Sequence, residues 1–170
     1  MQEQNFVAAK IWGPIPQAPR GFTWEQLMEW ALCMAEDGAK AGEVPVGALV
    51  CDMQGNILAK AHNLSIAESD PSAHAEISAL RMAGKKRGNY RLSDCVLVVT
   101  LEPCLMCTGA IREARLAGLV FGAYDKRAGA ICSSYEGLYC PDLGVNTWHY
   151  GGVLAEKSIA ILQKFFKEKR

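Results

Sequence analysis

The chain has 170 residues, of which 50% are hydrophobic and 21% are charged, as in an ordinary water-soluble globular protein. Its 18 basic and 18 acidic residues cancel, so net charge gives no support to a general nucleic-acid binder or a membrane-surface protein. The sequence contains no apolar run that could span a membrane and no secretory signal. Without such a signal, its seven cysteines argue against a disulfide framework and favour the reducing cytoplasm.

The N-terminal part of the chain divides into an arm and the start of one domain. Residues 1–22 contain several prolines and lack periodicity, so we expect an irregular N-terminal arm followed by a domain over 23–170. Apolar residues recur at helical spacing over 23–42, which predicts a helix. The segments 44–52 and 57–63 flank the turn sequence MQGN and are typical of a β-hairpin.

Two further helices are predicted on either side of a buried strand. Residues 70–88 favour a helix with Asp70 as its N-cap and Pro71 in its first turn. Residues 95–102, CVLVVTLE, form a continuous run rich in β-branched residues, the pattern of a strand buried on both faces. The segment 103–115 then predicts a helix that begins at its proline.

The last predicted elements are a strand over 117–125 and an amphipathic helix over 155–170. Helices therefore alternate with strands along most of the chain. This order predicts a single α/β sandwich with helices on both faces of a central sheet. We expect a ligand site in the loops at the carboxyl ends of the strands.

A pair of cysteines, Cys104 and Cys107, opens the helix that follows the buried strand, in the sequence PCLMC. Residues three apart lie on the same face of a helix, and the helix N-terminus favours thiolate over thiol. Thiolates suit either a redox pair or a metal site, and two small buried residues would show the same spacing. The pair alone leaves these three interpretations open.

A histidine and a glutamate thirty residues earlier favour the metal. His74 and Glu76 lie in the sequence AHAEI, at the start of the second predicted helix. One histidine and two cysteines give zinc three ligands and leave the fourth position open to water, as in catalytic sites. Glu76 then has a role as a proton carrier that does not bind the metal. The pattern H-x-E…P-C-x-x-C is a known signature of zinc nucleobase deaminases.

The competing interpretations explain fewer of these residues. A closed structural zinc site would need a fourth ligand, for which Cys95, Cys132 and Cys140 are the candidates. A redox pair would leave His74 and Glu76 without a role. The sequence therefore predicts a catalytic zinc site.

Several longer motifs give this chain a family resemblance that covers about residues 23–170. They are EVPVGALV, AHN, DPSAHAEISALR, NYRL, VTLEPCLMCTGAI and VFGAYDKRAGA. With them the chain resembles the bacterial tRNA-specific adenosine deaminases of the cytidine deaminase-like superfamily. The resemblance implies a three-layer α/β/α sandwich with a central mixed five-stranded sheet. It also implies hydrolytic deamination of adenosine to inosine at wobble position 34, by family analogy in tRNA-Arg with anticodon ACG.

The resemblance further implies how the site is organised. His74, Cys104 and Cys107 would hold one Zn²⁺ per subunit, with no organic cofactor. Glu76 would take a proton from the attacking water, pass it to N1 of adenine, and assist the departure of ammonia. The expected partners are the anticodon stem-loop of tRNA and a second copy of the chain in a homodimer.

Five residues are expected to contact the substrate by the same resemblance. Asn63 would hydrogen-bond the purine and Val46 would form an apolar wall of the base pocket. Asp125 would accept from a ribose 2′-hydroxyl, the group that distinguishes RNA from DNA. Lys126 would contact a phosphate, and Phe166 would stack on an unpaired base.

Simpler roles compete for the same positions. Asn63 is also typical of an Asx turn at the end of a strand, and Asp125 of a turn after one. One of Phe165 and Phe166 is expected to belong to the core. The basic cluster 85–87 is better explained as a helix C-terminus that complements the helix dipole than as an RNA contact.

Two other functions are consistent with the zinc motif. The first alternative is a free-base or nucleotide deaminase that acts on guanine or cytosine at the same zinc site. The second is a non-catalytic binding domain stabilised by zinc, which would leave Glu76 idle. The segment 136–152 matches the family pattern poorly, and the longer motifs nevertheless favour the tRNA deaminase.

Overall fold

The computed structural model describes residues 15–138 and 147–169. Nine helices and strands are described, in the order α1 (Trp24–Lys40), β1 (Gly47–Asp52), β2 (Ile57–His62), α2 (Ala75–Arg87), β3 (Cys95–Leu101), α3 (Leu105–Glu113), β4 (Gly118–Ala123), β5 (Trp148–Gly151) and α4 (Ala155–Glu168). No helix among these residues is long and apolar enough to cross a membrane.

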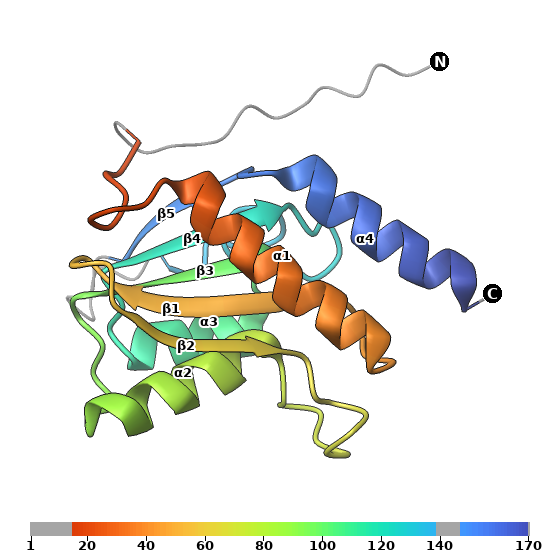
Figure 1. Ribbon diagram of the computed structural model, residues 1–170, viewed down its shortest axis with the longest axis horizontal. Coiled ribbons are helices and arrows are strands. Elements are labelled where there is room, and N and C mark those ends of the chain that lie inside the picture. The colour runs from red at the N-terminus through yellow and green to blue at the C-terminus, as the bar shows by residue number, and fades with distance from the viewer. Residues whose placement is uncertain (1–14, 139–146, 170) are drawn as a thin grey trace.

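The strands form one mixed sheet in the order β2-β1-β3-β4-β5. β1 is antiparallel to both β2 and β3, whereas β4 is parallel to both β3 and β5. Helices α1 and α4 cover one face of the sheet, and α2 and α3 cover the other (Figure 1). The expected three-layer α/β/α sandwich with a mixed five-stranded sheet is confirmed.

The core lies on both faces of the central strand β3. Leu97 and Val99 pack into the cluster beneath α2 and α3, and Val96 and Val98 into the cluster beneath α1. All four side chains are fully buried. Since alternate residues of a strand point to opposite faces, the continuous apolar run correctly indicated a strand covered on both sides.

The first helix is capped by Thr23, the first residue of the segment predicted to be helical. The Thr23 hydroxyl accepts from the Gln26 amide at 3.2 Å, and the Gln26 side chain accepts from the Thr23 amide at 2.9 Å. This reciprocal capping box satisfies two amides that the helix itself leaves without a partner. The helix ends at Lys40, two residues before the predicted end at Gly42.

The predicted start of α2 is wrong by several residues. The helix begins at Ala75 with His74 as its N-cap, so Asp70 and Pro71 lie in the preceding turn. The Asp70 carboxylate instead accepts from the backbone amide and the hydroxyl of Ser72, each at 2.7 Å. This local turn competes with the helix for the capping carboxylate, which explains the later start.

The third helix also begins later than expected. Cys104 is the N-cap of α3 and Leu105 is its first residue, so Pro103 lies outside the helix. The backbone of Cys104 pairs with Gly129 in an isolated β-bridge. The first cysteine is therefore fixed between a strand end and a neighbouring loop.

The fifth strand was implied only by the family resemblance, because the pattern of residues 148–151 does not indicate one. β5 has four residues and pairs with β4 in parallel. Trp148 makes an edge contact with the ring of Trp24 at 5.8 Å. Its ring also lies over Gly118, where a Cβ would come within 2.2 Å of the indole. Tertiary packing, which a short segment cannot reveal, places this strand.

The described part of the predicted N-terminal arm, residues 15–22, contains no helix or strand. The carbonyl of Pro16 accepts from the Trp24 indole N–H at 2.7 Å. Phe22 makes an edge contact with Trp30 at 5.2 Å. This stretch therefore lies against α1, and residues 1–14 lie outside the described part of the chain.

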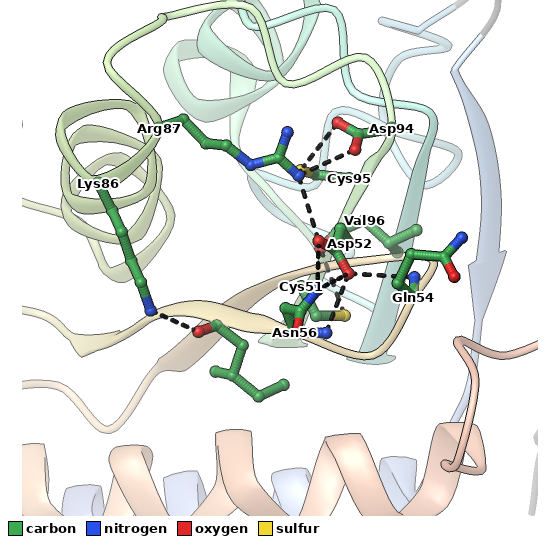
Figure 2. A network of polar contacts seen from close by, with 10 residues as sticks. Cys51, Asp52, Gln54, Asn56, Lys86, Arg87, Asp94, Cys95 and Val96 are labelled. Atoms are coloured by element: carbon green, nitrogen blue, oxygen red, sulfur yellow. Dashed lines mark hydrogen bonds and ion pairs between the residues drawn. The ribbon is translucent and has the colours of Figure 1, made fainter.

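Basic residues at the end of α2 contact the protein itself (Figure 2). Arg87 reaches Asp52 at 3.3 Å and Asp94 at 2.9 Å, so it joins the β1–β2 hairpin to the start of β3. Lys86 donates to the carbonyl of Ile57 at 2.9 Å. These contacts, and the position at the helix C-terminus, agree with a structural role for this cluster.

Replacing Arg87 tests this network. Arg87→Ala is expected to lower the free energy of unfolding at pH 7 by ~1 kcal/mol, because the pairs are partly exposed. The hydrogen bond from Arg87 lowers the pKa of Asp94 below its ordinary value of 3.8. A lowered carboxyl pKa stabilises the fold above pH 4 or so, and this contribution is lost as pH falls through the folded-state pKa. Urea unfolding at several pH values measures the difference.

The control for this prediction is Lys85→Ala, which removes one exposed charge from the same helical turn. The difference between Arg87→Ala and wild type should shrink in acid. An equal loss of stability in both variants, or a difference that grows as pH falls, would contradict the assigned role.

Candidate active site

Three metal-ligating side chains gather on the face of the sheet covered by α2 and α3. His74 Nδ1 lies 3.7 Å from Cys104 Sγ and 3.5 Å from Cys107 Sγ. All donor atoms of the three residues lie within 4.8 Å of one another. At usual Zn–S and Zn–N lengths, tetrahedral ligands stand about 3.6 Å apart. The donor atoms therefore fit around a single zinc ion.

Two helix N-termini bring these residues together. His74 caps α2, and Cys104 caps α3 with Cys107 in its first turn. The two helices pack side by side beneath the sheet (Figure 1). Free amides and helix dipoles at both N-termini favour negative charge, which suits thiolate ligands.

The two cysteines of the pair differ in how readily they lose a proton. A hydrogen bond from the Cys107 thiol, with further help from His74, lowers the pKa of Cys104 to about 4. The same hydrogen bond and burial raise the pKa of Cys107, so without metal the two sulfurs share one proton. The Cys104 sulfur in turn raises the pKa of His74. Metal binding must release the shared proton, because both sulfurs bind zinc as thiolates.

Other cysteines do not join this cluster in the described part of the chain. Cys95 opens β3, whereas Cys104 follows the end of that strand, so the two lie at opposite ends of it. Cys132 is not among the clustered ligands either. Cys140, the remaining candidate for a fourth ligand, lies outside the described residues. The three donors that cluster among the described residues match the number of protein ligands in an open zinc site of the catalytic kind.

Glu76 lies beside the cluster without belonging to it. It is the second residue of α2 and its side chain is 4% exposed. Burial raises its pKa above the ordinary carboxyl value, although the nearby His74 opposes the shift. A buried carboxyl with a raised pKa can hold a proton and release it to a neighbour at moderate pH.

Asn63 connects the end of β2 to the first turn of α2. Its side-chain oxygen accepts from the Ala75 amide at 2.9 Å, and its amide group donates to the Val44 carbonyl at 2.9 Å. The contacts bridge two elements, which differs from the simple Asx turn that the sequence also allowed. One amide hydrogen and one lone pair of Asn63 are left over. Val46, 6% exposed, accepts from the Asn63 backbone amide at 3.3 Å and lies next to it.

Asp125 and Lys126 lie in the loop after β4. The Asp125 carboxylate accepts from the backbone amides of Arg127 at 2.9 Å and Ala128 at 3.2 Å. This is the turn geometry that the sequence allowed for this residue. Lys126 is exposed, and its carbonyl accepts from the Ser134 hydroxyl at 3.3 Å.

The two phenylalanines of α4 have different environments. Phe165 is 9% exposed and belongs to the core, whereas Phe166 is 50% exposed. Their rings meet edge to face at 5.5 Å. Phe166 lines a surface pocket of about 370 Å³, together with Leu101, Ala123, Tyr124, Ile159, Leu162, Gln163 and Lys167. The metal-ligating residues do not line this pocket, so Phe166 stands apart from the cluster.

Two buried carboxylates were not identified from the sequence. Glu43 and Glu102 are each 2% exposed. Glu43 accepts from the amides of Ile66 at 3.0 Å and Ala67 at 2.8 Å. Glu102 accepts from amides of the loop after β4. A single charged residue inside an apolar stretch, as in TLEPC, is the signal that points to such a buried carboxylate.

Comparison with known proteins agrees with this site. Residues 23–123 match the cytidine and deoxycytidylate deaminase zinc-binding region. The tRNA-specific adenosine deaminase of Haemophilus influenzae is 45% identical over 146 residues, which cover 86% of this chain and 84% of that protein. The chain belongs to the tRNA-specific adenosine deaminase family. The predicted zinc cofactor is confirmed, since the matched region is zinc-binding and a fitting ligand cluster is present.

Comparison with solved structures agrees with membership of the tRNA-specific adenosine deaminase family. One from a study of A-to-I editing by tRNA:A34 deaminases at the wobble position is 37% identical, with a TM-score of 0.77. The match covers 81% of this chain and 99% of that one. Guanine deaminase from Bacillus subtilis is 38% identical with a TM-score of 0.58, over 61% of this chain and 66% of that one. The A34 deaminase is therefore matched over more of both chains.

Proposed function

We propose that this enzyme converts adenosine to inosine at wobble position 34 of tRNA by zinc-assisted hydrolysis. The observation that carries the proposal is the convergence of His74, Cys104 and Cys107 beside the buried Glu76. This arrangement occurs in a chain that matches a tRNA-specific adenosine deaminase over most of both lengths. Buried acid–base groups next to an open metal site suit hydrolysis rather than binding alone.

The proposed mechanism divides the work among four residues. His74, Cys104 and Cys107 would hold Zn²⁺ through one nitrogen and two sulfurs. The metal would supply a water of lowered pKa near neutral pH. Glu76 takes a proton from the attacking water and delivers it to adenine N1. Glu76 then takes the remaining proton from the hydroxyl added at C6 and delivers it to the C6 amino group, which leaves as ammonia while the carboxylate is restored.

We propose the same five substrate contacts that the sequence suggested. Asn63 retains one donor hydrogen for the purine, and Val46 lies next to it as an apolar surface. The exposure of Lys126 and Phe166 leaves them available to phosphate and to an unpaired base. The remaining contact, from Asp125, is to a ribose 2′-hydroxyl. The choice of tRNA-Arg with anticodon ACG rests on the family resemblance alone.

The ribose contact is tested by Asp125→Asn. Asparagine keeps the side-chain oxygen that accepts from Arg127 and Ala128, so the loop should keep its shape while the charge is lost. We expect the preference for RNA over DNA, measured as kcat/KM on matched stem-loops, to fall about tenfold. Unchanged discrimination would count against the ribose role.

A substrate panel tests the main proposal against its alternatives. Purified enzyme is incubated with bulk tRNA, free adenosine, guanine and cytosine, and products are identified by mass spectrometry. Inosine that appears only in tRNA supports the proposal. Turnover of guanine or cytosine instead supports a free-base deaminase, the alternative that the similarity to guanine deaminase favours. No product from any substrate supports a zinc-stabilised binding domain.

We also propose that the enzyme is a homodimer. Helices α2 and α3, which carry the candidate site, also expose apolar side chains. These are Met82 of α2 and Leu105 and Met106 of α3, and they support a dimer interface on this face. Sedimentation at micromolar concentration tests this directly. A monomer under these conditions would contradict it.

The domain boundaries and the location in the cell are proposals of the same kind. We propose that residues 1–22 form an arm and 23–170 the deaminase domain, of which 23–123 match the family. Cytoplasmic location is supported by Cys33, Cys51 and Cys95, which form no disulfide.

A further inference from the structure

The carboxylate of Glu102 collects hydrogen bonds from both ends of the loop after β4. Its Oε1 accepts from the amides of Ile131 at 3.1 Å, Cys132 at 2.8 Å and Ser133 at 2.9 Å. Its Oε2 accepts from the Asp125 amide at 3.1 Å and from the Ser133 hydroxyl. One side chain, 2% exposed, therefore holds the first and last residues of the loop 125–133.

This carboxylate is also next to the metal cluster. Glu102 precedes Pro103 and Cys104, and its own amide donates to the carbonyl of Ala123 at 2.8 Å. The loop passes so close that a Cβ at Gly129 would come within 2.4 Å of the Glu102 carboxylate. The backbone of Gly129 pairs with that of Cys104. The turn that supplies a metal ligand thus also anchors the loop.

The number of donors argues for a charged anchor. Burial of a carboxylate is costly unless hydrogen bonds compensate for lost water, and here five donors do so. A neutral turn would need no such group. The loop it anchors begins with Asp125 and Lys126, which the proposed function assigns to the RNA backbone.

We propose that Glu102 is a positioning residue that fixes the RNA-contacting loop 125–133 relative to the zinc ligand Cys104. This inference rests on the proposed function. By holding the amide of Asp125, the carboxylate sets how far the ribose and phosphate contacts lie from the reacting base. Geometry of this kind affects substrate binding more than the chemical step when the metal and Glu76 are untouched.

Glu102→Gln distinguishes the roles of the two carboxylate oxygens, because it keeps one oxygen and replaces the other with an amide group. The remaining oxygen can still accept from the amides of residues 131–133. The new amide group then faces the Ser133 hydroxyl, which can rotate to accept, and the Asp125 N–H, which cannot. The variant should therefore release Asp125 selectively, with one zinc per chain retained. Hydrogen exchange at the Asp125 amide is expected to quicken about tenfold, while amides 131–133 keep their protection.

Kinetics with a tRNA anticodon stem-loop give the second readout. Loss of this charge-assisted bond should raise KM about tenfold and leave kcat within about twofold of wild type. If Glu102 acts through Asp125, the effect should largely disappear in an Asp125→Ala background. Glu136→Gln, which removes an exposed carboxylate from the same region, is the matched control and should leave KM unchanged.

Each outcome bears on the inference. Unchanged exchange at Asp125, loss of zinc, or a lower kcat with unchanged KM would each overturn it. If Glu102→Gln does not fold, hydrogen exchange of the wild-type protein tests the inference. The amide of Asp125 must then exchange more slowly than the amide of its neighbour Lys126, an exposed residue. Absence of inosine with wild-type enzyme counts against the proposed function alone, since the exchange and zinc readouts need no substrate.

Discussion

Glu76→Ala is expected to abolish nearly all deamination while zinc and fold are retained. Proton transfer by a positioned carboxyl contributes about 10²–10⁴-fold to a rate, and here Glu76 is assigned every proton transfer of the reaction. The residue is 4% exposed and stands outside the ligand cluster, so its removal should not release the metal. Inosine formation by mass spectrometry and zinc content by elemental analysis measure the two effects.

Stability gives a further readout of the same variant. Burial raises the pKa of Glu76, which means that the fold disfavours its charged form. Alanine is a good helix former at the second position of α2, so Glu76→Ala should melt no lower than wild type. If Glu76→Ala keeps its stability but loses activity, the Glu76 carboxyl serves catalysis and not the stability of the fold.

Two companion variants separate proton transfer from charge loss. Glu76→Gln keeps the size and polarity of the side chain but cannot carry the proton, and it should be as inactive as the alanine variant. Glu68→Ala removes an exposed carboxylate before the same helix and should have normal activity. A near-normal rate for either Glu76 variant would refute the mechanism.

Local sequence patterns were sufficient where neighbouring residues determine the structure. The buried strand β3 follows from an unbroken apolar run, and α1 from apolar residues at helical spacing. The proposed zinc ligands were identified from two short motifs, each of which also begins a helix. Their meeting in space required only that both helices lie on one face of the sheet.

Sequence patterns did not predict the hydrogen-bond partner or the burial of a side chain for which several arrangements were possible. Asp70 has the residue type of an N-cap, yet Ser72 offers it two nearer donors. The partners of Glu102 lie more than twenty residues away, in a loop whose path no local pattern specifies. Only the packing of α4 against the rest of the protein decides that Phe165 belongs to the core and Phe166 to the surface. Long-range packing supplies this information.

Removal of a proposed metal ligand is the second change with a large expected effect. Cys104→Ala and His74→Ala should each lose bound zinc and with it all measurable turnover, because two remaining donors cannot complete a tight site. Zinc per chain after dialysis against a chelator measures the loss. Since the metal stabilises only the folded chain, wild type stripped of zinc should melt near the temperature of these variants.

Two cysteine variants provide the controls for this prediction. Cys33→Ala removes an exposed thiol of α1 and should keep one zinc per chain. Cys132→Ala tests whether the site is closed by a fourth protein ligand, and an open site predicts full zinc content, because the substitution keeps the Cys132 backbone amide that donates to Glu102. Zinc loss from Cys132→Ala would show that Cys132 is a fourth ligand and that the site is a closed, structural one. One tightly bound zinc in Cys104→Ala or His74→Ala would show that the ligand set itself is wrong, because the described residues offer no other donor in this cluster to replace the lost one.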